Sequence, residues 1–188
     1  VITVNGVDYH VAIENGEATV TVSGLEAGDY TVAVKYAGDD NYNAAEVTKG
    51  VNVAKANPAL NVIIDSVDYG NVFTINAVLT GVNNAPLDTN IIVTVNGKNY
   101  IVAIVNGKGT FHADKLAAGS YNFNARFAGS NNYNEVSDSG KFNVYKVDSA
   151  IGITVKDINV GEDAVITVKL FSDATGSVTV TVNGKDYT

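Results

Sequence analysis

The sequence predicts an all-β protein made of tandem β-sandwich domains without disulfides. Apolar and polar residues alternate throughout, Asn-Gly pairs fall between the alternating runs, and the pattern returns after 91 residues. Period-two alternation is typical of half-buried strands, and Asn-Gly supplies the positive φ angles that a tight hairpin turn needs. Cysteine is absent, so no disulfide can form.

The repeat defines the expected domains. A shift of 91 residues aligns residues 1–55 with 92–146 without a gap, at 23 identical positions of 55. The same shift aligns residues 55–79 with 146–170. This period exceeds the roughly 20–50 residues of solenoid units and suits a self-contained β-domain. We expect residues 1–55 to form the C-terminal part of one repeat, 56–146 a complete repeat, and 147–188 the N-terminal part of the next.

The core of the complete repeat is predicted from the alternation. Each expected strand carries an apolar or aromatic residue at every second position, and such residues point to one face of a sheet. These inward residues are Leu60, Val62, Ile64, Phe73, Ile75, Ala77, Leu79, Val93, Val95, Tyr100, Val102, Ile104, Phe111, Ala113, Tyr121, Phe123, Ala125, Phe127, Phe142 and Val144.

Hairpins are predicted at the Asn-Gly pairs. The complete repeat has two, at Asn96-Gly97 and Asn106-Gly107. The first belongs to a T-V-N-G-x-x-Y motif that begins at residues 3, 94 and 181. Each copy is expected to form the same hairpin, with a type I′ turn at its tip.

The segment L-x-A-G-x-Y, at residues 25–30 and 116–121, refines the fold class. Together with about seven short strands per repeat, it is typical of an immunoglobulin-like sandwich, in which a corner tyrosine bonds to the backbone just upstream. Tyr30 and Tyr121 would be these tyrosines; alternatively, Tyr121 is simply a core aromatic residue. Val32 and Phe123 stand where antibody domains have their second cysteine, so an apolar plug would replace the disulfide.

Charge and composition argue against several functions. The chain has 20 acidic and 12 basic residues, which gives a net charge of -8 and disfavours binding to nucleic acid or anionic lipid. No apolar run approaches the ~20 residues of a membrane-spanning helix. The two histidines, His10 and His112, do not recur at equivalent positions of the repeat. We therefore expect neither an enzyme nor a cofactor.

One loop offers candidate calcium ligands. Residues 38–43, G-D-D-N-Y-N, contain Asp39, Asp40 and Asn41, and calcium prefers oxygen ligands. The equivalent loop, residues 129–134, reads G-S-N-N-Y-N and has no carboxylate. We favour a solvated turn in which Tyr42 and Tyr133 pack back onto the sandwich.

Covalent cross-links are not expected. The chain lacks glutamine, which thioester and ester cross-links require. A lysine–asparagine isopeptide needs a buried lysine, and no lysine is predicted at an inward strand position.

Several motifs resemble a known family. They are "VGEDAVITV" at 160–168, "GSVTVTVNGKDYT" at 176–188, "NGEATVTVSGLEAGDYTVAVKYAGDDNYNAA" at 15–45, and V-x-K at the end of each repeat. They are similar to the bacterial-type immunoglobulin-like repeats of very large surface proteins, especially the adhesin-like proteins of methanogenic archaea. The resemblance implies an extracellular tandem array at the cell surface, without catalytic residues. The stretch "ARFAGSNNYNEVSDSG" at 125–140 is more polar than that pattern.

Two functions follow from these expectations. The first is a structural spacer, the stalk or shaft of a surface fibre, with neighbouring repeats or identical chains as partners. Short linkers at residues 54–58 and 145–149 favour a semi-rigid array, in which Lys55 and Lys146 are expected to pair across the junctions. The alternative is a module that binds a cell-surface glycan or protein through loops 80–90 and 130–139.

The T-V-N-G hairpin occurs in both flanking segments. A strand exchanged between subunits would be encoded once, whereas residues 1–9 and 178–187 encode the same hairpin start. We therefore expect the chain to be a segment of a longer tandem polypeptide.

Overall fold

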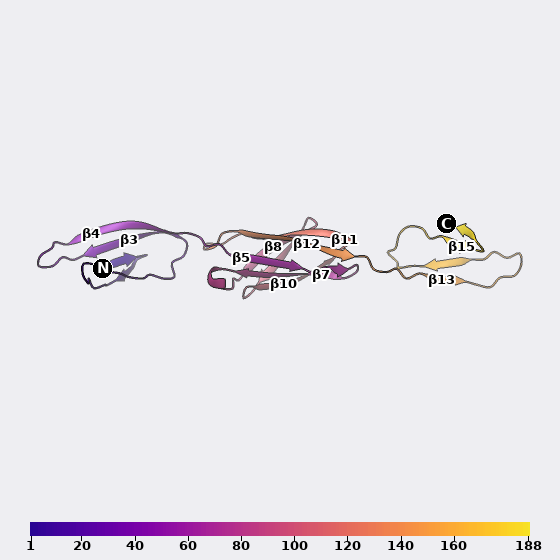
Figure 1. The fold of residues 1–188 in the computed structure, drawn as a ribbon, viewed down its shortest axis with the longest axis horizontal. Helices are drawn as coiled ribbons and strands as arrows, with labels where there is room; N and C mark the ends of the chain where they lie inside the picture. Colours follow the sequence, from indigo (N-terminus) through magenta and orange to yellow (C-terminus); the bar gives the residue numbers. More distant parts are fainter. The chain divides into compact units, whose positions relative to one another are not determined.

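The computed structural model describes all 188 residues and is all-β, with one short 3₁₀ turn, η1 (Val82–Asn84), and no α-helix (Figure 1). The chain divides into two compact units, Val1–Tyr145 and Lys146–Thr188. The first unit contains a complete β-sandwich and, before it, an open sheet. The second contains two separate hairpins.

Two sheets form the complete sandwich. The first has the order β10-β7-β5, and its strands are β5 (Ala59–Ile64), β7 (Val72–Thr80) and β10 (Lys108–Lys115). The second has the order β6-β12-β11-β8-β9. Its strands are β6 (Val67–Asp68), β8 (Thr89–Val95), β9 (Lys98–Ile104), β11 (Gly119–Phe127) and β12 (Val136–Tyr145). β6 runs parallel to β12, and the other pairs are antiparallel. This two-sheet arrangement agrees with the immunoglobulin-like sandwich that the sequence predicts.

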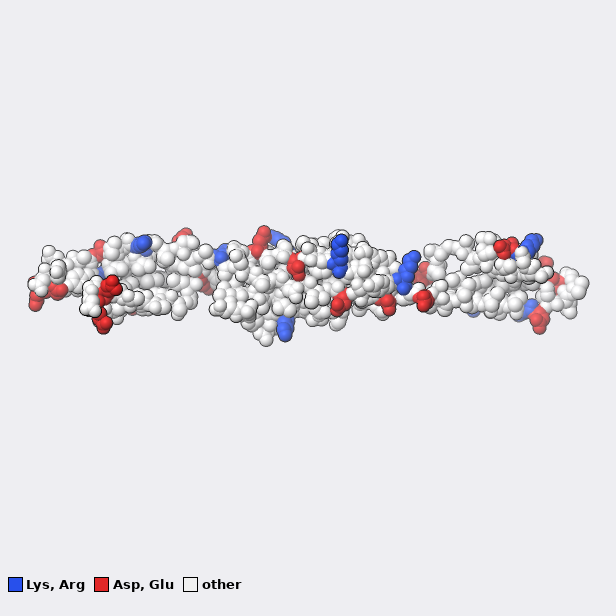
Figure 2. Space-filling view, in the orientation of Figure 1, with Lys and Arg blue, Asp and Glu red and all other residues white.

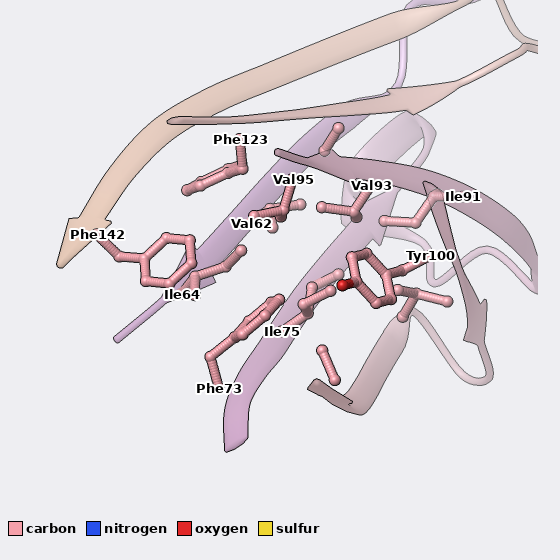
Figure 3. Close-up of a cluster of buried hydrophobic side chains, with 14 of the residues drawn as sticks. Val62, Ile64, Phe73, Ile75, Ile91, Val93, Val95, Tyr100, Phe123 and Phe142 are labelled. Atoms are coloured by element: carbon pink, nitrogen blue, oxygen red, sulfur yellow. The ribbon is translucent and has the colours of Figure 1, made fainter. Parts of the chain in front are cut away.

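The predicted core lies between these sheets (Figure 3). All of the predicted inward residues are buried except Leu60, Phe111 and Tyr121, which are half-buried and pack against the cluster. Phe73 is fully buried and lies edge-on to Tyr100, with its ring 5.0 Å from that of Phe142. Ile91 was missed by the sequence analysis, although it is 0% exposed. Ile91 lies two residues before Val93 on β8 and so belongs to the same alternation as Val93 and Val95.

The Asn-Gly turns are confirmed. Asn96 and Gly97 have φ angles of 49° and 76°, and Asn106 and Gly107 have 50° and 75°. Positive φ at both central residues is the type I′ geometry, which matches the twist of the flanking strands. Asn5 and Asn183, at the same place in the flanking copies, also have positive φ.

Residues 1–53 form the open sheet, with the order β2-β1-β3-β4. Its strands are β1 (Ile2–Val4), β2 (Val7–Tyr9), β3 (Gly28–Tyr36) and β4 (Ala45–Val53). They correspond to β8, β9, β11 and β12 of the complete domain at a shift of 91 residues. No strand forms over residues 18–27, although the equivalent region of the complete domain contains β10.

The second unit, Lys146–Thr188, forms two hairpins. β13 (Gly152–Val155) pairs with β14 (Ile166–Lys169), and β15 (Val180–Val182) pairs with β16 (Lys185–Tyr187). They correspond to β5, β7, β8 and β9 of the complete domain, but the hairpins are not bonded into one sheet.

Two expectations are corrected in the open sheet. Lys49 lies opposite Val32 in the β3–β4 register, on the face that carries the alternating valines, so one lysine does occupy an inward position. It remains exposed there. Tyr42 does not pack onto a sandwich but is 70% exposed, because the open sheet has no second layer against which the ring could pack. Tyr133 does pack against the core of the complete domain.

Candidate functional site

The histidines lie apart from any recognisable catalytic arrangement. His112 is exposed on β10, with Nδ1 3.0 Å from Thr74 Oγ1, and His10 is exposed after β2. No group of three His, Cys, Asp or Glu side chains in the chain is arranged to hold a metal ion. No helix is long and apolar enough to cross a membrane.

The loop at residues 38–43 is a turn organised by Asp39. Its Oδ1 accepts hydrogen bonds from the amides of Asn41, at 2.7 Å, and Tyr42, at 2.9 Å. Its Oδ2 accepts the hydroxyl of Tyr36. Short acidic side chains commonly cap turns in this way. Of the predicted calcium ligands, Asp39 therefore has Oδ1 engaged within the loop and Oδ2 engaged by Tyr36 of β3, and Asn41 contributes its backbone amide to the turn.

The same contacts change the acidity of the loop. The Tyr36 hydroxyl, followed by the Asn41 amide, lowers the pKa of Asp39 below its ordinary value. The hydrogen bond to Asp39 in turn raises the pKa of Tyr36. Asp39 is exposed and Tyr36 is half-buried, so the pair lies at the surface and stabilises the turn.

The equivalent loop of the complete domain, residues 129–134, has a different role, because it holds the linker. The Ala56 amide donates to Asn132 O at 2.9 Å, and the Asn134 amide donates to Ala56 O at 2.9 Å. Ala56 and Tyr133 thus form an isolated parallel bridge. We call residues 55–57 and 129–134 together the junction clamp.

Side chains reinforce the junction clamp. Lys55 Nζ donates to Ser130 O at 2.7 Å, so the recurrent lysine reaches across the junction as expected, although its partner is a carbonyl. Asn134 Nδ2 donates to Asn57 Oδ1 at 2.7 Å. Asn132 Oδ1 accepts the Ala27 amide at 2.8 Å and so joins the loop to the segment that precedes β3.

Loop 80–90, the other candidate binding loop, meets the junction clamp at Tyr133. A Cβ atom on Gly81 would overlap the Tyr133 ring, so the glycine allows the two loops to pack closely. Backbone bonds fold the loop back on itself, including Gly81 N to Ala85 O at 2.8 Å. Leu87 packs against the core, and Val82 remains 51% exposed.

A polar cluster that the sequence analysis missed joins β9 to β10. Lys98 and Tyr100 both contact the Asp114 carboxylate, and the Tyr100 hydroxyl donates to Oδ2 at 2.9 Å. Burial, together with the hydrogen bond to Asp114, raises the pKa of Tyr100 to about 12. Lys98 chiefly lowers the pKa of Asp114. The K-x-Y spacing was a usable signal, since it recurs at Lys185 and Tyr187, whose ammonium and ring centroid are 5.2 Å apart.

The charged side chains form no continuous block on the face in Figure 2, where red and blue groups stand singly among uncharged surface. Uncovered apolar surface is concentrated in the flanking segments. In the open sheet, a cavity of about 460 Å³ is lined by residues that include Val32, Val34, Val47 and Val51. In the second unit, a groove of about 790 Å³ lies along Ile166, Val168 and the β15–β16 hairpin.

Comparison with known proteins identifies no relative: no protein-family model matches the chain, and no curated protein matches it in sequence. The geometry itself defines the class, which is an all-β protein with one complete two-sheet β-sandwich and no disulfides. The two features that bear on function are the junction clamp and the apolar surfaces of the flanking segments, one on the open sheet and one in the second unit.

Proposed function

We propose that this chain is part of an extracellular structural spacer, the stalk or shaft of an adhesin-like fibre at the cell surface. The observation that carries the proposal is the junction clamp. Its backbone bridge at Ala56 and its side-chain bonds from Lys55, Asn132 and Asn134 connect consecutive repeats within one unit. A protein that only needed to tether two domains would not need an ordered linker.

The clamp restrains rotation at the linker. Ala56 bonds to the loop of the following domain through both its backbone amide and its carbonyl group. Pro58 fixes one further φ angle of the linker. A net contribution of about 1 kcal/mol for each hydrogen bond favours the ordered junction over a free hinge. Repeats joined in this way transmit orientation along the chain, as a stalk requires.

The resemblance of the repeat motifs to archaeal surface repeats supports the cell-surface location in this proposal. The chain also has features that suit an exposed array. It is acidic, with a net charge of -8, and it has no cysteine. On this proposal the partners are neighbouring repeats or identical chains within a fibre.

The alternative, recognition of a glycan or protein by loops 80–90 and 130–139, has less support. Ser130, Asn132 and Asn134 bond to the linker or to residues before β3, and residues 136–139 belong to β12. A glycan array probed with the full chain tests this alternative. Specific binding that is lost on substitution of Val82 would favour it over the spacer.

Residual dipolar couplings test the spacer. In the unmodified chain, the amides of β3–β4 and those of residues 59–145 should share one alignment tensor. The double variant Asn132→Ala, Asn134→Ala removes the side-chain bonds and should reduce the alignment of β3–β4 relative to the complete domain. The matched control, Asn122→Ala, Asn124→Ala, changes two exposed asparagines of β11 outside the clamp and should have no effect. Two independent tensors in the unmodified chain would contradict the proposal.

A further inference from the structure

The complete domain has two Asn-Gly turns with the same local sequence. Residues 95–98 and 105–108 both read V-N-G-K. Their φ angles are nearly equal, 49° and 76° in the first turn and 50° and 75° in the second. The two turns therefore have closely similar intrinsic chemistry, and a difference in their reactivity has to come from what surrounds them.

An Asn-Gly pair can react with itself. The Gly backbone nitrogen can attack the Asn side-chain carbon Cγ and close a five-membered ring. Glycine favours this attack, because it has no Cβ to obstruct the nitrogen and its backbone rotates freely. The attack requires a Gly amide that water can reach and that no hydrogen bond holds in place.

The first turn, at the tip of the β8–β9 hairpin, meets these conditions. Asn96 and Gly97 are both exposed. A Cβ atom on Gly97 would have no other atom within 4 Å. The ladder between β8 and β9 begins at the pair Val95 and Lys98, and the Gly97 amide donates no hydrogen bond. The nitrogen of Gly97 is therefore available as a nucleophile.

The second turn is covered by the loop between β7 and β8. Gly107 is buried, and its amide donates to Leu87 O at 3.2 Å. The Asn106 amide donates to Asp88 Oδ1. A Cβ atom on Gly107 would lie 2.9 Å from Pro86 Cβ, so the loop is packed against the turn. Attack by the Gly107 nitrogen would first have to break these contacts.

We propose that Asn96 is a site of spontaneous deamidation in the folded protein, and that loop 80–90 protects Asn106 from the same reaction. The Gly97 nitrogen forms a bond to Asn96 Cγ, the Cγ–Nδ2 bond breaks, and Nδ2 leaves as ammonia with the proton that the Gly97 amide loses. One water molecule then opens the succinimide ring. Opening at Cγ gives aspartate, and opening at the backbone carbonyl carbon gives isoaspartate. The inference does not depend on the proposed spacer function.

Either product changes the tip of the hairpin. The new carboxylate makes the chain one unit more negative than its present net charge of -8. Isoaspartate also leads the main chain through Cγ, which lengthens a turn whose two-residue geometry matches the twist of the strands. Neither Asn96 nor Gly97 belongs to the buried cluster, so the core of the sandwich should persist after the reaction.

Peptide mapping of the full chain tests the proposal. Trypsin cleaves after Lys55, Lys98 and Lys108, and so places the two turns in separate peptides, residues 56–98 and 99–108. After incubation of the folded chain at mildly alkaline pH, mass spectrometry should show that Asn96 converts about tenfold or more faster than Asn106, because two hydrogen bonds hold the second turn. Equal rates, or faster conversion at Asn106, would overturn the proposal.

The same chain unfolded in urea is the matched comparison. Both sites should then convert at nearly equal rates, because their local sequences agree. A difference that persisted in urea would show that flanking residues, and not loop 80–90, set the rates. A rate at Asn96 that fell by about tenfold or more on folding would show that the hairpin itself protects this turn. Either result would contradict the proposal.

Two variants of Asp88 test the protecting contact. Asp88→Ala removes the acceptor of the Asn106 amide and should raise the conversion rate at Asn106 about fivefold, while the rate at Asn96 stays the same. The matched control, Asp88→Asn, keeps an oxygen acceptor at the same place and should leave Asn106 protected. Unchanged conversion at Asn106 in Asp88→Ala would show that this contact does not protect the turn.

Discussion

The paired strands β11–β12 and β3–β4 share one register but differ in burial. Gly119 pairs with Val144 in the complete domain, and Gly28 pairs with Val53 in the open sheet, the same register at a shift of 91 residues. Phe142 is nevertheless 2% exposed, whereas Val51 at its place is 43% exposed. Strand pairing here is fixed locally by the turn and the alternation, whereas burial requires the facing sheet, which is β10-β7-β5 in the complete domain.

Residues equivalent to the β10-β7-β5 sheet show the other side of this comparison. β10 forms in the complete domain because β7 lies beside it, while residues 18–27 of the first repeat have no such partner and form no strand. An edge strand depends on its neighbour for hydrogen bonds. The sandwich is therefore stabilised by contacts between distant segments, and the following predictions test that conclusion.

The largest expected effect is at Phe73. Phe73→Ala should lower the free energy of unfolding of the complete domain by about 4 kcal/mol, because a fully buried aromatic side chain leaves a cavity. Urea unfolding followed by circular dichroism, with hydrogen exchange to locate the change, measures it. Val51→Ala, on the uncovered face, should change stability by about 0.5 kcal/mol or less. Equal effects would contradict the proposed difference between the two sheets.

Gly140 should tolerate no side chain, whereas the open sheet has a lysine at its place. A Cβ atom on Gly140 would lie 2.6 Å from Phe123 Cε1, so Gly140→Ala should cost about 2 kcal/mol through overpacking. In the open sheet, Lys49 faces the smaller Val32. The double variant Phe123→Val, Gly140→Ala should therefore cost less than the sum of the two single substitutions in the same unfolding experiment. Strict additivity would show that the positions are not coupled.

The corner tyrosines should behave alike in both sheets. Tyr121 donates to Ala117 O at 2.8 Å, and Tyr30 donates to Glu26 O at 2.9 Å, which confirms the predicted tyrosine corner. Replacement of either tyrosine by phenylalanine should lower the free energy of unfolding by about 1 kcal/mol. This corresponds to roughly a fivefold loss of amide protection in β11 or β3. Hydrogen exchange measures both. A loss confined to Tyr121→Phe would show that the corner depends on the facing β10-β7-β5 sheet.

The Tyr100 hydroxyl predicts a pH dependence of the complete domain. Its pKa of about 12 in the folded state lies above the unfolded value near 10. The folded state therefore retains a proton that the unfolded state loses, and stability should fall as the pH rises from about 10 to 12. Tyr100→Phe should reduce this alkaline loss in thermal melts. At the place of Asp114, the first repeat has Ser23, so the open sheet lacks this contact.

The smallest expected effect is that of a chelator. EDTA should leave the melting temperature unchanged, because both Asp39 oxygens already accept hydrogen bonds, from the turn and from Tyr36, and the equivalent loop has no carboxylate. Scanning calorimetry with and without EDTA measures it. A fall in melting temperature that added calcium reverses would contradict this assignment.

Most of the sandwich could be predicted from the sequence because its information is local. The alternation identified the buried positions, and Asn-Gly identified the hairpins, since both depend only on neighbouring residues. The parallel pairing of β6 with β12 was not predicted, because nothing within Val67–Asp68 specifies a partner so distant in sequence. The inward position of Lys49 was not predicted, because inward positions were assigned only where the residue is apolar or aromatic.

The junction clamp was only partly predictable. The short linkers and the recurrent Lys55 indicated a contact between consecutive repeats. The residue that Lys55 contacts, Ser130, lies in a loop that the sequence suggested as a binding loop. The repeated N-Y-N at residues 41–43 and 132–134 was an available signal. Polar loops that bind a ligand and polar loops that bind a linker have the same composition, so only their neighbours in space distinguish them.

The short parallel pair β6–β12 also determines how the complete domain would respond to tension. β6 follows closely on the strand that enters the domain, and β12 is the strand that leaves it. A pull on the two ends of the domain would slide β6 and β12 past each other along their length. The hydrogen bonds between them would then bear the force together. These include Tyr69 N to Tyr145 O at 2.8 Å and Asn143 N to Ser66 Oγ at 2.9 Å. Bonds sheared together resist force better than bonds opened one after another. A few residues at Ser66–Tyr69 would then set the force at which the domain begins to unfold.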